Sequence, residues 1–61
     1  MLVRITNKSA FNVFIDIDGD KRTEDTVQIG PKGRETVELP SEKRYLEIAK
    51  EFGNKIVMRK V

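Results

Sequence analysis

The chain contains neither cysteine nor histidine. Without cysteine it can form no disulfide bond and no thiolate metal site. Without histidine it lacks the commonest general base and a common metal ligand, so its serine and threonine hydroxyls have no imidazole to activate them. These absences predict a protein that is not an enzyme, that takes no cofactor or metal, and that has no small-molecule substrate.

Long hydrophobic runs are also missing. No apolar stretch approaches the ~18 residues that a transmembrane helix needs. The N-terminal region lacks the apolar core and the small-residue cleavage site of a signal peptide. We therefore expect no membrane contact, and we expect the protein to stay where it is made, in the cytoplasm.

The chain is short as well, with 61 residues that we expect to form one domain (residues 1–61). A domain of this size buries only about 60% of its unfolded surface. Small domains usually need a disulfide, a metal or a partner to be stable. Since the composition removes the first two, the sequence predicts association with copies of itself or with another protein.

Acidic residues are absent from both ends of the chain, although the totals of 12 basic and 10 acidic residues nearly balance. Residues 1–15 and 52–61 together carry five cations, which are Arg4, Lys8, Lys55, Arg59 and Lys60. If the terminal strands pair, these cations form a positive patch that suits an acidic protein surface or nucleic acid. The abundance of Lys, Arg and Glu beside a single Gln is typical of a thermophile.

Residues 11–17 show the strongest local pattern, Phe-Asn-Val-Phe-Ile-Asp-Ile. Apolar residues at every second position predict a strand with one buried face, formed by Phe11, Val13, Ile15 and Ile17. The rest of the chain is expected to supply elements that cover this face.

Four more strands are predicted, at residues 1–6, 26–29, 35–39 and 56–61. Turn-forming residues separate the first strand from the second and the third from the fourth, and they suggest two hairpins. In the second of these turns, Gly33 is expected to be free to take a positive φ.

A helix is predicted between Ser41, a favourable N-cap, and Gly53, a favourable C-terminal stop. Its apolar stripe consists of Tyr45, Ile48, Ala49 and Phe52. The resulting order, β-β-β-β-α-β, predicts an α+β fold that is mostly β. We expect a small five-stranded twisted sheet or open barrel with one C-terminal helix packed on it.

Alternating carboxylates in Asp16-Ile17-Asp18-Gly19-Asp20 raise the question of a calcium loop. The template fails because Lys21 stands where the loop needs glycine, and Val27 stands where it needs a bidentate glutamate. The segment is therefore interpreted as the acidic tip of a loop.

The segment Gly30-Pro31-Lys32-Gly33-Arg34 combines glycines with cations, as phosphate-binding loops do. Such a loop is followed by a helix whose N-terminal amides converge on the phosphate. A strand is predicted to follow instead, so the segment is interpreted as a tight turn.

Apolar residues on both faces of two strands suggest a contact surface. Phe14 lies opposite the predicted buried face, and Val57 and Met58 fall on different faces of the last strand. One helix covers one face of a sheet, so either the sheet closes on itself or its outer face meets a partner, and we favour the partner. The candidate interface consists of Phe14, Val57 and Met58 with the cations Arg4, Lys8, Arg59 and Lys60.

Several short segments follow one another in an order that is similar to a known group of proteins. They are Ile5-Thr6-Asn7-Lys8-Ser9, Thr26-Val27-Gln28-Ile29-Gly30-Pro31 and Glu35-Thr36-Val37-Glu38-Leu39-Pro40, followed by a short helix and a Val-containing strand. This pattern resembles small proteins encoded among bacteriophage virion genes. The resemblance implies a minor structural component, such as a head decoration, neck or tail-associated protein, present in many copies.

Three hypotheses for function follow. The first is a non-enzymatic virion component that docks on capsid or tail neighbours, with cations at the rim of the contact setting its register. The alternative is a small nucleic-acid-binding or regulatory β-barrel that uses the same cations, although nucleic acid is not the expected partner. A third is a free-standing homo-oligomer.

Overall fold

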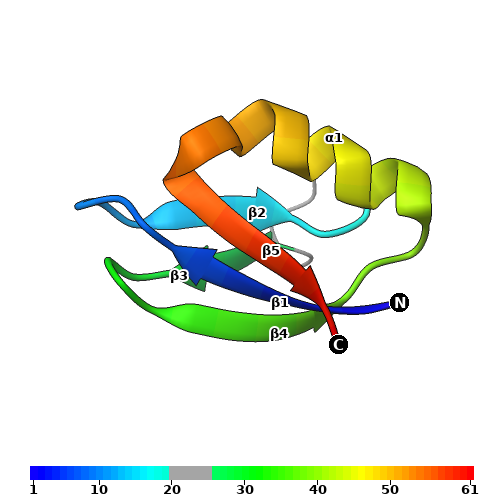
Figure 1. Ribbon diagram of the computed structural model, residues 1–61, viewed down its shortest axis with the longest axis horizontal. Helices are drawn as coiled ribbons and strands as arrows, with labels where there is room; N and C mark the ends of the chain where they lie inside the picture. Colours follow the sequence, from blue (N-terminus) through cyan, green and yellow to red (C-terminus); the bar gives the residue numbers. More distant parts are fainter. Residues whose placement is uncertain (20–25) are drawn as a thin grey trace.

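A computed structural model of the chain describes residues 1–19 and 26–61, and Figure 1 shows their arrangement. The elements are β1 (Leu2–Asn7), β2 (Val13–Asp16), β3 (Thr26–Ile29), β4 (Arg34–Glu38), α1 (Glu42–Phe52), the 3-10 helix η2 (Gly53–Lys55) and β5 (Ile56–Lys60). A mostly β fold with one C-terminal helix is thereby confirmed.

The strands form two antiparallel sheets rather than one sheet or a barrel. The larger sheet has the order β4-β1-β5, and the smaller one pairs β2 with β3. The predicted hairpin of the first two strands is wrong, because β1 pairs with β4 and β5, and the chain crosses to the other sheet after Asn7.

The turn between β3 and β4 is present, but it joins strands of different sheets. The Gly33 amide donates to the Gly30 carbonyl over 2.9 Å, as in a β-turn. A positive φ occurs at Lys32 (φ 64°), so the prediction of a positive φ at Gly33 was wrong. Lys32 is held there in part by its ammonium group, which donates to the Lys8 carbonyl over 3.2 Å.

Both sheets and the helix contribute to a single core. Its apolar members are Val3, Ile5, Val13, Ile15, Ile29, Val37, Leu39, Ile48 and Ile56. The alternation predicted for the second strand is confirmed at Val13 and Ile15, while Ile17 is only partly buried beyond the strand end. Phe11 was predicted to be buried and is instead 78% exposed, because β2 begins only at Val13.

The helix has the predicted ends. The Ser41 side chain accepts a hydrogen bond from the Arg44 amide, and Gly53 (φ 55°) donates its amide to the Ala49 carbonyl. Ile48 lies fully buried on the predicted apolar stripe. Within the described part of the chain, no helix has the length and apolar character that crossing a membrane requires.

A single polar residue, Asn7, is fully buried among the described residues. Its amide nitrogen lies 2.7 Å from the Phe11 carbonyl, 2.9 Å from the Ile29 carbonyl and 2.9 Å from the Gly30 carbonyl. Its side-chain oxygen accepts from the amide and the hydroxyl of Ser9. The side chain thus bonds the segment that leads into β2 and the segment that leaves β3.

The backbone of Asn7 adds a third attachment, since its amide donates to the Gly33 carbonyl over 2.8 Å. One residue at the end of β1 therefore fixes the start of β2, the end of β3 and the approach to β4. A buried polar group costs free energy unless all its hydrogen-bonding capacity is used. Here the amide and the carbonyl oxygen of the side chain are both satisfied.

Replacing Asn7 by alanine is expected to lower the free energy of unfolding by about 2–4 kcal/mol, because three buried or partly buried carbonyls lose their donor. Urea denaturation followed by circular dichroism measures this change. Asn54→Ala is the control, since Asn54 is exposed. Equal urea midpoints for the two variants would show that the Asn7 contacts do not stabilise the fold.

Candidate functional site

The candidate interface residues are distributed over several parts of the molecule. Phe14 lies in β2 of the smaller sheet and is 58% exposed. Arg4, Arg59 and Val57 lie on the outer face of the larger sheet. The structure therefore separates the predicted patch into two surfaces, and the interface role of each residue stays a prediction.

The other three candidates lie elsewhere. Met58 faces the interior and packs against the core, opposite Ile5. Lys60 points to the helix, where its ammonium group bonds Glu42 over 2.7 Å and lies 5.2 Å from the centre of the Tyr45 ring. The hydrogen bond to Glu42 raises the pKa of the Lys60 ammonium group. Lys8 is exposed in the crossing between the sheets.

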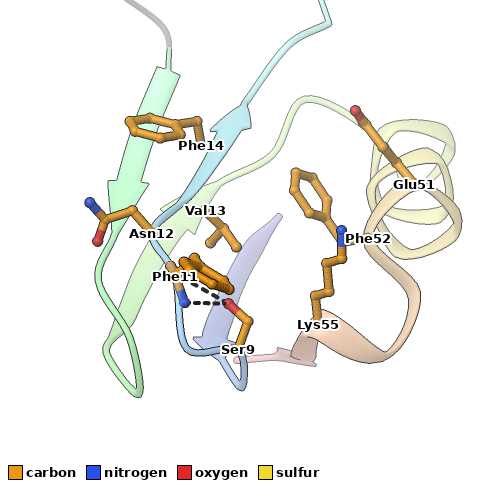
Figure 2. A pocket seen from close by; sticks show the side chains of 8 residues that line it. All are labelled: Ser9, Phe11, Asn12, Val13, Phe14, Glu51, Phe52 and Lys55. Carbon is orange, nitrogen blue, oxygen red and sulfur yellow. Dashed lines mark hydrogen bonds between the residues drawn. The ribbon is translucent and has the colours of Figure 1, made fainter.

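The first surface is a groove of about 370 Å³ beside β2 (Figure 2). All three phenylalanines of the chain line it, together with polar and charged residues at its rim. Its lining consists of Ser9, Phe11, Asn12, Val13, Phe14, Glu51, Phe52 and Lys55, and we call it the aromatic groove. Figure 2 shows Phe52 reaching from the end of α1 toward the space beside β2.

Local structure explains why aromatic rings gather there. The Ser9 hydroxyl lies 2.8 Å from the Phe11 carbonyl, and the Phe11 amide lies 3.3 Å from the Ser9 hydroxyl oxygen. These contacts and the bond from Asn7 hold Phe11 before the strand begins, with its ring exposed. Phe52, the last residue of α1, is only partly buried.

Sequence reasoning assigned Phe11 and Phe52 to the core and so missed their part in the groove. The Asn-x-Ser turn is the sequence signal that could have predicted the exposure of Phe11, because its side chains bond the Phe11 backbone. No local signal distinguishes Phe52, because its exposure depends on where the helix ends relative to β2.

The second surface is the outer face of the larger sheet. Arg4 lies directly opposite Arg59 in β5 and Thr36 in β4, and Thr6 lies opposite Arg34. Directly opposed residues share one face of a sheet. Arg4, Arg34 and Arg59 are therefore on the same side, and we call it the arginine face. Of the five cations of the predicted positive patch, the strand register places Arg4 and Arg59 on this face, while Lys60 lies on the opposite face beside the helix. Arg34 is an addition that the sequence did not indicate.

Two acids border the arginine face. Glu38 is paired with the amino group of Met1 at 2.5 Å, so its charge is already balanced. Glu35 lines the same hollow as Arg4 and Arg34. Like charges directly opposite one another in a sheet are destabilising, and Arg4 and Arg59 are such a pair. An anion placed between them would relieve this repulsion.

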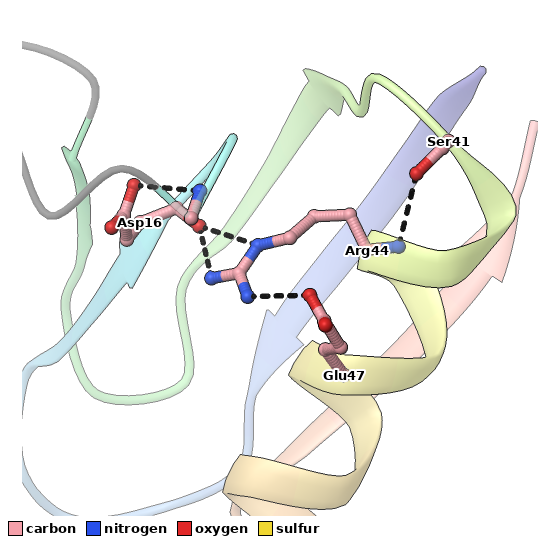
Figure 3. A network of polar contacts seen from close by, with 5 residues as sticks. Asp16, Ser41, Arg44 and Glu47 are labelled. Atoms are coloured by element: carbon pink, nitrogen blue, oxygen red, sulfur yellow. Dashed lines mark hydrogen bonds and ion pairs between the residues drawn. The ribbon is translucent and has the colours of Figure 1, made fainter.

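A polar network ties the helix to the end of β2 (Figure 3). The guanidinium of Arg44 donates to the Asp16 carbonyl through Nε over 3.1 Å and through a second nitrogen, and it bonds Glu47 at 3.2 Å. Gly19, with φ 79°, lies where a Cβ would contact the guanidinium at 3.5 Å. Arg44 thereby fixes α1 beside β2 and so defines one side of the aromatic groove.

The described residues, 1–19 and 26–61, contain no group of three or more carboxylates close enough to hold a metal ion. Within the acidic segment, the Gly19 amide donates to the Asp16 carboxylate over 3.2 Å. The remaining members of the rejected calcium pattern, Asp20 and Lys21, lie outside the described residues.

Comparison with known proteins found no family model, no curated protein and no solved structure that matches this chain.

Arg44→Met is expected to lower the free energy of unfolding by about 1–2 kcal/mol. The variant keeps most of the aliphatic packing but removes the donors to the Asp16 carbonyl. Thermal unfolding measures the loss. Lys43→Met is the control because Lys43 is the neighbouring exposed cation.

Glu47→Gln separates the two contacts of Arg44, since Glu47 is about half exposed and such ion pairs contribute little. A loss for Glu47→Gln as large as that for Arg44→Met would contradict the assignment of the effect to the Asp16 carbonyl.

Proposed function

We propose that this protein is a non-enzymatic docking protein that binds a protein neighbour through the aromatic groove. The observation that carries the proposal is the exposure of Phe11 and Phe14 beside the partly buried Phe52 in one groove. Contiguous exposed apolar surface of this kind is typical of a contact site, and aromatic rings are enriched at the centres of protein interfaces.

The size of the exposed rings indicates how strong such a contact is. Phe11 is 78% and Phe14 is 58% exposed, which corresponds to about 270 Å² of surface for rings of ~200 Å². Burying that area contributes about 7 kcal/mol. This is comparable with the roughly 4–15 kcal/mol that association costs, so a single contact is weak.

A weak contact is useful when it is repeated. On a symmetric assembly, many copies of a small protein bind with avidity although each contact is weak. The sequence pattern resembles that of small bacteriophage virion proteins, and such proteins are present in many copies, which suits repeated weak binding. We therefore propose a capsid or tail neighbour in a virion as the partner, with the virion as the location and with the protein present in many copies.

Photocrosslinking in the cell that makes the protein tests the proposal. A photoreactive phenylalanine analogue at position 14 is expected to give one discrete adduct with an assembly subunit, identified by mass spectrometry. The same analogue at position 46 is the control, because Leu46 is an apolar residue of similar exposure (59%) on α1 and is not part of the groove lining. Equal labelling from both positions, or adducts with unrelated proteins only, would contradict the proposal.

The arginine face supports a second candidate function, binding of nucleic acid through its phosphates. Three arginines lie on adjacent strands. Arginines bind the phosphates of a nucleic-acid backbone independently of base sequence. Among the described residues this face carries no aromatic side chain for base stacking, since all three phenylalanines line the groove and Tyr45 lies on α1. This candidate therefore concerns duplex nucleic acid.

Salt dependence distinguishes the two functions. If three arginines each neutralise one phosphate, affinity for a short DNA duplex should fall by about 40-fold between 50 and 200 mM salt. Arg4→Gln should reduce the slope of log affinity against log salt by about one unit, whereas Lys43→Gln should leave it unchanged. Fluorescence anisotropy measures both. Absence of binding at 50 mM salt would eliminate the second function.

A further inference from the structure

The side of β2 that faces the aromatic groove is an open strand edge. In the smaller sheet β2 pairs only with β3, so among the described elements nothing pairs with its other side. In Figure 2 this side faces the end of α1 across the groove. An open edge presents unpaired amides and carbonyls, which are a template for another strand.

The Asp16 carbonyl shows which backbone groups point to the open edge. It accepts hydrogen bonds from Arg44 on α1, so it points away from β3. Asp16 lies opposite Thr26 in the register of β2 and β3, and successive residues of a strand alternate in direction.

Phe14 has the same backbone orientation as Asp16. Since it is two residues from Asp16 in the same strand, its amide and carbonyl point to the open edge. Its ring is exposed, and Phe14 belongs to the lining of the aromatic groove. The groove therefore offers main-chain hydrogen bonding and apolar surface at the same place.

We propose that the partner of this protein inserts an extended, uncharged apolar segment into the aromatic groove, where the segment pairs as a third strand with β2. This inference rests on the proposed docking function and specifies the chemistry of the bound segment. The Phe14 amide and carbonyl make the central pair of hydrogen bonds, and alternate side chains of the segment contact the phenylalanine rings. Strand addition of this kind combines affinity from the main chain with selectivity from alternate side-chain pockets.

The neighbouring residues limit the length and charge of the segment. At one end Arg44 already occupies the Asp16 carbonyl, so pairing is centred on Phe14. At the rim, Lys55 and Glu51 balance one another in charge. A segment of about three paired residues with no charge therefore fits best, since each further residue would meet Arg44.

A second copy of the chain fits this edge less well than a lone segment. Two copies that buried their exposed Phe11 and Phe14 rings would cover about 540 Å², below the roughly 1,000 Å² of a stable interface. The helix also flanks the edge at both ends, through Arg44 at Asp16 and Phe52 at Val13. A second copy would bring its own helix to the same place, whereas a single extended segment would not.

Hydrogen exchange of the Phe14 amide in the full chain tests the proposal. The probes are capped, uncharged five-residue peptides with Thr at the first, third and fifth positions and every combination of Val, Ile, Leu and Phe at the other two. In the free protein the Phe14 amide should exchange faster than the amides of Val13 and Ile15, which face β3. At about 1 mM peptide, at least one combination should slow exchange at Phe14 by about tenfold or more.

Backbone N-methylation of the best peptide provides the matched control, because it removes an amide donor and keeps the side chains. It should abolish the protection of Phe14 and weaken binding by about tenfold. Phe52→Ala should weaken binding of the parent peptide, whereas Leu46→Ala should not. If no combination protects Phe14, or if the methylated peptide protects it equally, strand addition is wrong.

The result separates this inference from the docking function itself. If Phe14 is never protected by peptides but photocrosslinking from position 14 still captures an assembly subunit, docking stands and strand addition fails. If Phe14 becomes protected with rising protein concentration and no peptide, a second copy is the occupant and the segment proposal is overturned.

Discussion

The buried amide of Asn7 is the contact on which the rest of the structure depends. It lies at the end of β1, where the chain must leave the larger sheet, and it bonds the carbonyls of Phe11, Ile29 and Gly30. A polar group in the interior is tolerated only when its hydrogen bonds are complete, so this one arrangement of the strand ends is favoured over its alternatives. The two sheets are joined at this residue rather than through a shared ladder.

Division into two sheets creates the surfaces that the protein presents. Among residues 1–19 and 26–61 the smaller sheet has two strands, so β2 keeps an open edge there, and Arg44 holds the helix beside it. The larger sheet turns its outer face away from the core and places Arg4 opposite Arg59. The aromatic groove and the arginine face thus follow from the same topology, although one presents apolar side chains and main-chain groups and the other presents charge.

Small size connects these surfaces with the proposed role. In the described part of the chain the core is built from nine apolar side chains contributed by both sheets and the helix, which leaves little surplus stability for a chain of this length. A protein of this kind gains stability whenever a neighbour covers exposed rings or completes an open strand edge, because binding to the folded state adds to its stability. The proposed docking on an assembly in many copies would therefore serve both stability and function.

The sequence by itself determined the elements and part of the core. Alternation predicted burial of Val13 and Ile15, and capping chemistry predicted a helix that begins after Ser41 and ends before Gly53, because these signals act between residues close in the chain. It did not determine strand pairing, the burial of Asn7 or the exposure of Phe11, and it gave no reason to add Arg34 to the cations. Each of these depends on contacts between distant segments, such as the bond between Asn7 and Ile29, and only the tertiary structure brings those segments together.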